Sequence, residues 1–162
     1  MFPYAFEIAD IRAYFDRLLA KVVDFMHQIM NVDRVSILLC DPTTKELVPR
    51  VSRSRTGDRN AANRVPRSIV RKAVEDRVAI LSDNAQIDGR FTGESILIQG
   101  VRSAMCTPLL GSEQSVLGIL YVDNQTAIHS FSDEDLEFLI AFGGLTAVAL
   151  ENSQMAERIR RE

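Results

Sequence analysis

The sequence contains only two cysteines, which excludes the disulfide frameworks that hold many small secreted domains together. Cys40 and Cys106 each lie inside an apolar, strand-like segment, where a thiol is expected to be reduced and buried. Two cysteines in such places form neither a disulfide framework nor a zinc site. The fold must therefore rest on a hydrophobic core, which a chain of 162 residues is long enough to build.

Long hydrophobic runs are also missing. No uninterrupted apolar stretch approaches the roughly 18 residues needed to span a bilayer, and Glu7 and Asp10 interrupt the segment where a secretory signal would be apolar. We therefore expect a cytoplasmic protein without a membrane partner. Hydrophobic residues make up 46% of the chain and charged residues 25%, which is ordinary for a globular protein. The chain has no internal repeat and no linker, so we predict a single domain over residues 1–162.

Catalytic motifs are absent as well. The sequence has no GxSxG, no HExxH and no glycine-rich phosphate loop. Its two histidines, His27 and His129, are expected to be surface or capping residues. We therefore predict a protein that is not an enzyme and that holds no metal or resident cofactor.

One segment is rich in basic residues. Residues 45–77 contain ten lysines and arginines against four acidic residues, a balance that could attract an anion or could simply form a solvated face. No aromatic residues are interleaved with these charges for stacking on bases, so we expect no nucleic-acid partner.

The apolar pattern predicts helices at both ends of the chain and a sheet between them. Apolar residues three and four apart predict an N-terminal helix over residues 7–30. A sheet with its pocket loops is expected over residues 35–123, and Pro66 is expected to open a short helix within it. The predicted strands are residues 35–40, 46–52, 78–81, 103–110 and 115–123. This order is typical of an α+β domain with an antiparallel sheet of five to six strands.

The last predicted helix, residues 132–160, has the clearest start. Ser132 can cap it, and Asp135 three residues later completes a capping box. From residue 136 to residue 150 almost every side chain is apolar or small, so this helix needs two burial partners. The sheet supplies one. The other is a second subunit, through Phe138, Phe142 and Leu145, or the first helix of the same chain.

Four segments in this order resemble GAF domains of bacterial signalling proteins: SDNAQIDGRF, ESILIQGVRSAMCTPLL, SVLGILYVDN and FSDEDLEFL. The resemblance covers about residues 10 to 155. It implies terminal helices packed on one face of the sheet and a loop-covered ligand pocket on the other. It also implies a regulated partner, since such modules occur beside cyclases, kinases, phosphatases, FHA domains or enhancer-binding activators.

The resemblance also suggests candidate ligand contacts. Ser36 stands where cyclic-nucleotide-binding relatives carry a strand serine that faces the ligand, and Arg53 and Arg55 follow the second strand at the expected rim. Tyr121 stands where those relatives often place a purine-reading glutamate. Gln125 and His129 replace the lysine and phenylalanine of their signature, whereas Asn124, Asp133 and Glu134 persist. The full set of candidates is Ser36, Arg53, Arg55, Asp83, Asn84, Arg90, Phe91, Ser95 and Tyr121.

Two functions remain open at this stage. In one, a small and anionic ligand such as a nucleotide enters the pocket and shifts the terminal helices of a homodimer. In the other, the domain binds no ligand and only dimerises and relays a signal. A third hypothesis, an enzyme, follows from relatives that reduce free methionine sulfoxide. That chemistry needs a reactive thiolate with a resolving partner. No cysteine lies in a predicted loop.

Overall fold

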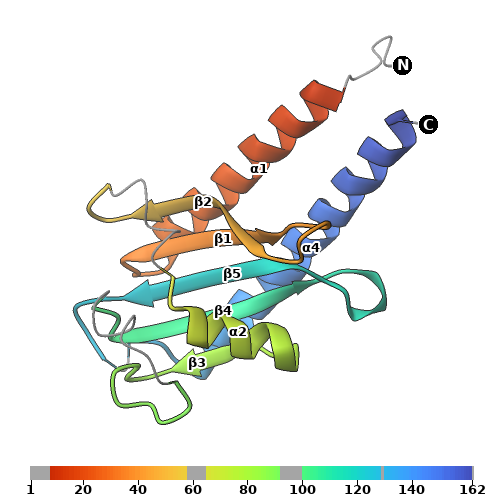
Figure 1. Ribbon diagram of the computed structural model, residues 1–162. Coiled ribbons are helices and arrows are strands. Elements are labelled where there is room, and N and C mark those ends of the chain that lie inside the picture. The colour runs from red at the N-terminus through yellow and green to blue at the C-terminus, as the bar shows by residue number, and fades with distance from the viewer. Residues whose placement is uncertain (1–7, 58–64, 92–99, 129, 162) are drawn as a thin grey trace.

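A five-stranded antiparallel sheet separates one helix from two others in the computed structural model (Figure 1). The structure describes residues 8–57, 65–91, 100–128 and 130–161. Helices α1 (Ile8–Ile29) and α4 (Asp133–Arg161) cover one face of the sheet, and α2 (Arg67–Asp76) lies on the other. The strand order is β2-β1-β5-β4-β3. The strands are β1 (Arg34–Cys40), β2 (Leu47–Ser54), β3 (Ile80–Ser82), β4 (Ser103–Leu110) and β5 (Val116–Asn124). The predicted α+β class is confirmed.

The sequence-based boundaries differ from the structure mainly at β2 and β3. Strand β2 continues to Ser54 rather than ending at residue 52, because Arg53 and Ser54 still pair with β1. Strand β3 begins two residues later than predicted. Arg77 ends α2 in the left-handed conformation, and the amide of Val78 still bonds back to that helix, so the chain is not yet extended there. The amino-acid pattern does not show these two boundaries, because hydrogen bonds to other parts of the chain set them.

Two local predictions are confirmed in atomic detail. In the β1–β2 turn, Oδ1 of Asp41 accepts hydrogen bonds from the amides of Thr43, at 2.7 Å, and Thr44, at 3.0 Å. At the start of α4, the amide of Asp135 donates to Oγ of Ser132 at 3.2 Å, and the amide of Ser132 donates to Oδ2 of Asp135 at 2.8 Å. This reciprocal pair is the predicted capping box.

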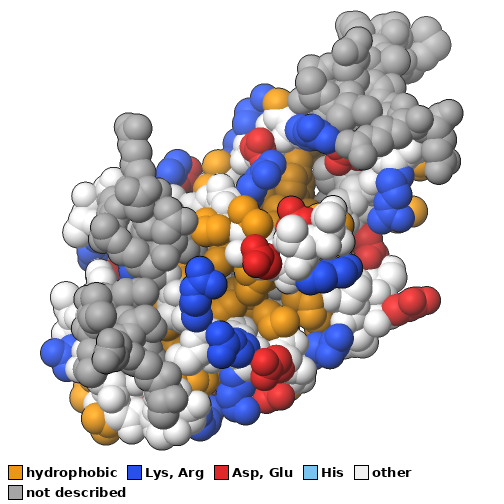
Figure 2. All heavy atoms as spheres, viewed as in Figure 1, with side chains coloured by type: hydrophobic (Ala, Val, Ile, Leu, Met, Phe, Trp, Pro, Cys, Tyr) orange, Lys and Arg blue, Asp and Glu red, His pale blue; other side chains and the backbone are white. Residues whose placement is uncertain are grey.

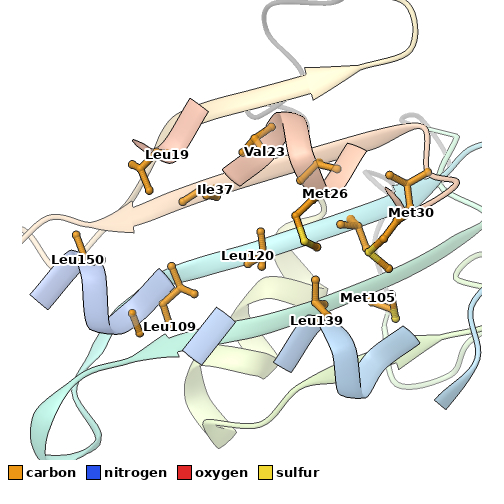
Figure 3. Packing of buried hydrophobic residues seen from close by; sticks show 14 of the residues in the cluster. Leu19, Val23, Met26, Met30, Ile37, Met105, Leu109, Leu120, Leu139 and Leu150 are labelled. Atoms are coloured by element: carbon orange, nitrogen blue, oxygen red, sulfur yellow. The ribbon is translucent and has the colours of Figure 1, made fainter. Parts of the chain in front are cut away.

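The sheet buries a hydrophobic core on each of its faces. Between the sheet and the terminal helices, leucine, isoleucine and methionine side chains from both layers interdigitate (Figure 3). Those labelled in the figure are Leu19, Val23, Met26, Met30, Ile37, Met105, Leu109, Leu120, Leu139 and Leu150. On the opposite face, α2 packs Ile69, Val70 and Ala73 against strand residues that include Cys106 and Tyr121. Cys106 is buried as expected, but Cys40 is only half-buried.

His27 differs from its predicted surface placement. Its side chain lies in the last turn of α1 and is half-buried, and its Nε2 is buried with no hydrogen-bond partner among the described residues. His129 lies outside the described residues.

Helix α4 approaches the sheet closely at one glycine. A Cβ at Gly143 would lie only 2.7 Å from Cγ2 of Thr107 on β4, whereas a Cβ at the adjacent Gly144 would meet nothing within 4 Å. Two adjacent glycines lower the helix propensity of α4, and close packing can offset that cost. Gly143 packs closely in this way, against the sheet of the same chain.

By length and composition alone, the stretch Asp133–Ile159 of α4 could cross a bilayer. This corrects the expectation that no segment of the chain could do so, which counted only uninterrupted apolar runs. Leu139 and Leu150 of this stretch are fully buried in the core beneath the helix. One side of α4 therefore packs into the core of the domain, whereas only 28% of its most apolar window is buried.

The two glycines of α4 form a matched pair for mutagenesis. We expect Gly143→Ala to lower the free energy of unfolding by ~1–2 kcal/mol, because overpacking against Thr107 outweighs the gain in helix propensity. Gly144→Ala should raise it by ~0.5–1 kcal/mol. Urea denaturation followed by circular dichroism measures both. Equal shifts for the two variants would contradict the close approach at Gly143.

Candidate functional site

The central strands bring three of the chemically interesting side chains into one row on the α2 face. Ser36 pairs with Tyr121, which in turn pairs with Cys106 on the next strand. Val35 and Ile37 belong to the core under α1 and α4, so Ser36 between them faces the other way, as the sequence predicted. The hydroxyl of Ser36 is buried and has no hydrogen-bond partner in the described chain. Ser36 and Tyr121 are therefore neighbours on the α2 face of the sheet.

Next to this row lies a buried ion pair that the sequence analysis missed. Nε of Arg34 donates to both carboxylate oxygens of Asp123 at 3.0 Å, and its Nη2 donates to Oδ2 as well. The hydroxyl of Tyr121 donates to the same oxygen at 2.7 Å. Asp123 and Tyr121 are wholly buried, and Arg34 is 4% exposed. Only the β1–β5 register reveals this pair, since the two residues lie far apart in the sequence.

The electrostatics of this network fix the protonation states of Arg34 and Tyr121. Burial alone would lower the pKa of Arg34, but the hydrogen bonds and charge of Asp123 outweigh burial and raise that pKa. Burial, with the neighbouring carboxylate, raises the pKa of Tyr121 well above its usual value. Arg34 therefore stays charged and Tyr121 stays neutral. In these states each polar group has a partner, which a buried network needs.

The loop after β3 forms a second, more exposed polar cluster. Arg90 donates to the carboxylate of Asp88 and to the carbonyl of Leu81, at 2.7 Å, and Oγ of Ser82 donates to Asp88 at 2.8 Å. The hydrogen bond from Arg90 lowers the pKa of Asp88 to about 2. The guanidinium also lies over the Phe91 ring, 5.0 Å from its centre. Asp88 and Arg90 thus hold the loop in shape.

The other candidates in this loop have different environments. Phe91 is buried in the core beneath α2, and Oδ1 of Asn84 is buried without a hydrogen-bond partner in the described chain. Asp83 lies in the same loop. Ser95 lies outside the described residues. A ligand role for any of them stays a prediction.

The two arginines expected at the pocket rim have different environments. Arg53 lies inside β2 rather than after it, and its Nε donates to Asp24 of α1 at 2.5 Å, on the face opposite Ser36. Arg55 pairs with Asp33 at 2.9 Å and donates to Asn31 at 2.6 Å. The expectation that both follow the strand beside Ser36 is therefore wrong for Arg53, because β2 extends further than predicted.

A groove of about 570 Å³ opens on the α2 face, between the β1–β2 hairpin and α2. Apolar side chains form its floor, and Lys45, Arg67 and Arg71 lie at its border, with Glu46 and Glu75. Within the described chain, none of these three cations takes part in an ion pair. Figure 2 shows the apolar floor in orange, with blue Lys and Arg side chains beside it. All three belong to the basic segment noted in the sequence.

The β4–β5 turn makes hydrogen bonds both to the residue that follows α2 and to α4. Nε of Arg77, the residue after α2, donates to the carbonyl of Gln114 in the β4–β5 turn at 2.9 Å. On the other side of that turn, the amide and hydroxyl of Ser112 donate to Glu151 of α4 at 2.7 and 2.8 Å. These bonds lower the pKa of Glu151. The turn therefore touches both the helix beside the groove and the terminal helix.

The face of α4 that points away from the sheet is apolar and exposed. Leu145 is 70% exposed and Val148 is 60% exposed. Phe142 is half-buried because its ring stacks on Phe25 of α1 at 5.6 Å and on Phe138 at 5.8 Å. The three predicted interface residues thus lie close together. Phe142 contacts the first helix of its own chain, and Leu145 remains open.

The model of the GAF domain family matches residues 15–150 of the sequence. The chain belongs to the GAF domain family. As a GAF domain it is a module of the sensory and regulatory kind.

Solved structures from several organisms share this fold. The GAF3 domain of Slr1393 from Synechocystis superposes with a TM-score of 0.75 at 14% identity, over 90% of this chain and 99% of that one. The GAF domain of a phosphoenolpyruvate-protein phosphotransferase from Coxiella burnetii gives 0.72 at 16% identity, over 91% and 92%. A type II free methionine-R-sulfoxide reductase from Thermoplasma acidophilum gives 0.70 at 12% identity, over 88% and 96%. A search of curated proteins finds no significant match.

The signature loop of this GAF domain has a structural role. Oδ1 of Asn124 accepts a hydrogen bond from the amide of Asp33 at 2.9 Å, and its Nδ2 donates to the carbonyl of Asn31 at 3.2 Å. The amide of Gln125 donates to the Asp33 carboxylate at 2.7 Å. The persisting asparagine therefore ties the end of β5 to the connection between α1 and β1.

The buried cysteine of this GAF domain, Cys106, is a poor nucleophile by position. Burial raises the pKa of Cys106 to about 12, so its thiol stays protonated at neutral pH. Cys40 lies at the end of β1, two strands away from Cys106 in the sheet order. Among the described residues, no group of three or more His, Cys, Asp and Glu side chains could hold a metal ion.

The buried ion pair should dominate the stability of the α2 face. Asp123→Asn should cost ~3–5 kcal/mol of unfolding free energy, because it leaves the Arg34 charge buried without a counter-charge. Tyr121→Phe removes one hydrogen bond and should cost about 1 kcal/mol. Urea denaturation distinguishes the two. The double variant Arg34→Met, Asp123→Leu should be more stable than Asp123→Asn, and a double variant as unstable as the single one would contradict this explanation.

Proposed function

We propose that this GAF domain is a non-catalytic regulatory module that relays a signal through a homodimer formed by α1 and α4. The observation that carries the proposal is the exposed apolar face of α4, where Leu145, Val148, Met155 and Ile159 are each at least half exposed. A helix that is apolar on both sides needs a second partner. Helix α1 covers only one flank of it, at Phe142.

Helix α1 extends the same surface. Its Tyr14, Phe25 and Ile29 are large hydrophobic residues that are 63%, 46% and 48% exposed. Between α1 and α4 lies an apolar groove of about 170 Å³, which Leu145 borders. A second copy would fill this groove with its own apolar side chains. Contiguous exposed apolar patches of this kind usually mark interaction sites, and a specific interface buries on the order of 1,600 Å² in total.

The arrangement of the helices suits a relay. Helices α1 and α4 run side by side, and the N-terminal part of α1 and the C-terminal part of α4 project together beyond the sheet (Figure 1). Arg12 and Glu157 join these parts by an ion pair at 2.7 Å. A shift of one helix is therefore passed to the other, toward an effector domain or a partner protein.

Dimerisation can be tested with two glutamate variants of α4. The wild-type domain should have twice its 18.1 kDa chain mass in light scattering after size exclusion. Leu145→Glu should have the monomer mass, because a charge at the centre of the interface cannot be buried. Ile140→Glu is the matched control, since Ile140 is also exposed but points away from this face. A wild-type monomer at high concentration would refute the dimer.

A second candidate function is binding of a small anion with an apolar body in the groove between the β1–β2 hairpin and α2. The observation that favours it is the apolar floor with the unpaired Lys45, Arg67 and Arg71 beside it. Ser36, Tyr121 and Arg34 are buried under the chain's own residues, so this open groove offers easier access than their row. A ligand against α2 would reach α4 through Arg77 and the β4–β5 turn.

Thermal melting with a panel of compounds tests this second function. Nucleotides, cyclic AMP, cyclic GMP and carboxylate metabolites should be screened, and a binder at a hundred times its dissociation constant stabilises the domain by about 2.7 kcal/mol. Arg71→Ala should abolish the shift and added salt should weaken it. Lys72→Ala, on the same helix but outside the groove lining, should not. If no compound shifts the transition, the alternative of a relay without ligand is favoured.

A further inference from the structure

We infer that Asn152 aligns the two α4 helices of the dimer as a parallel, in-register pair. This inference rests on the dimer proposed above and assigns a specificity-determining residue to its interface. It starts from the spacing of one row of exposed positions on α4. They alternate by three and four residues, and we call them the α4 seam: Phe138, Ala141, Leu145, Val148, Asn152, Met155 and Ile159.

The α4 seam has the repeat of a coiled coil. In heptad notation Phe138, Leu145, Asn152 and Ile159 occupy position a, and Ala141, Val148 and Met155 occupy position d. Every seam side chain is exposed in the single chain. From Phe138 to Ile159 the seam is ~32 Å long at the rise of an α-helix. A second copy of the same helix has the complementary repeat, which is why we assign the seam to a second copy.

Asn152 is the polar member of this seam, and its side chain has no hydrogen-bond partner in the described part of its own chain. The side chain is exposed and makes no hydrogen bond with any described residue. Its neighbour Glu151 binds the β4–β5 turn, and Glu157 binds Arg12 of α1. The helix faces beside the seam are therefore engaged within the chain, whereas the seam at Asn152 is left open.

An amide in an apolar interface discriminates between alignments. In a parallel, in-register pair, Asn152 meets Asn152 of the second copy, and each amide can both donate and accept a hydrogen bond. A slip of one heptad puts Asn152 against Leu145 or Ile159, and an antiparallel pair puts it against a d residue. Each of these leaves a buried amide without a partner, which is unfavourable. Only one alignment satisfies Asn152.

Disulfide trapping tests the alignment. In a Cys40→Ser background, Met155→Cys should link two chains almost completely under mild oxidation, because d residues face each other in a parallel pair. Ala149→Cys occupies position e at the middle of the seam. Its copies lie on opposite sides of a parallel pair, but they face each other in an antiparallel pair that overlays the whole seam. It should therefore not link. Linking of Ala149→Cys without Met155→Cys would overturn the inference.

The role of Asn152 itself is tested by Asn152→Leu. Sedimentation equilibrium should show tighter association, by at least tenfold in the dissociation constant, together with species larger than a dimer or a loss of the selective Met155→Cys link. Gln154→Leu, off the seam on the same helix, is the matched control and should change neither. If the wild type is a dimer and Asn152→Leu keeps the same affinity, size and link, Asn152 is not the determinant, although the dimer stands. A monomeric wild type would instead refute the dimer itself.

Discussion

The close packing of α4 on the sheet at Gly143 and Thr107 is the contact on which the rest of the structure depends. It brings Leu139 and Leu150 into the core beneath the helix. Because a helix is rigid, fixing this side also fixes which residues point away from the sheet. The exposed side then presents an apolar seam along the helix, and α1 can cover only its edge. The signal-relay hypothesis therefore follows from how this one helix sits on the sheet.

On the opposite face of the sheet, charged side chains bind one another. The Arg34–Asp123 pair, closed by the Tyr121 hydroxyl, occupies part of the region where the family resemblance implied a ligand. Arg53, Arg55 and Arg90, the expected anion donors, each bind a carboxylate of the chain itself. Lys45, Arg67 and Arg71 at the α2 groove have no ion pair within the described chain and lie beside an apolar surface. The chain thus departs from the nucleotide-binding pattern in its side-chain partners as well as in its sequence.

Local signals in the sequence were sufficient for most of the fold. Ser132 and Asp135 predicted the start of α4, and Asp41 predicted the first hairpin, because these interactions involve residues close in sequence. The side of the sheet faced by Ser36 followed from alternation. The contacts of the candidate site were harder to predict from the sequence. The partner of Arg34 depends on the β1–β5 register, and the orientation of Arg53 depends on the length of β2, neither of which has a local signal. The α2 groove likewise combines elements that only tertiary packing brings together.

Hydrogen–deuterium exchange at several protein concentrations tests the central claim most directly. Residues 152–161 of α4 follow the last contact with the β4–β5 turn, so their amides should open readily in a single chain. If a second copy covers the seam, their protection should rise as concentration increases through the dissociation constant, while the protection of β1 and β5 should stay constant. Protection of residues 152–161 that is the same at every concentration, in a protein that remains monomeric, would contradict the account.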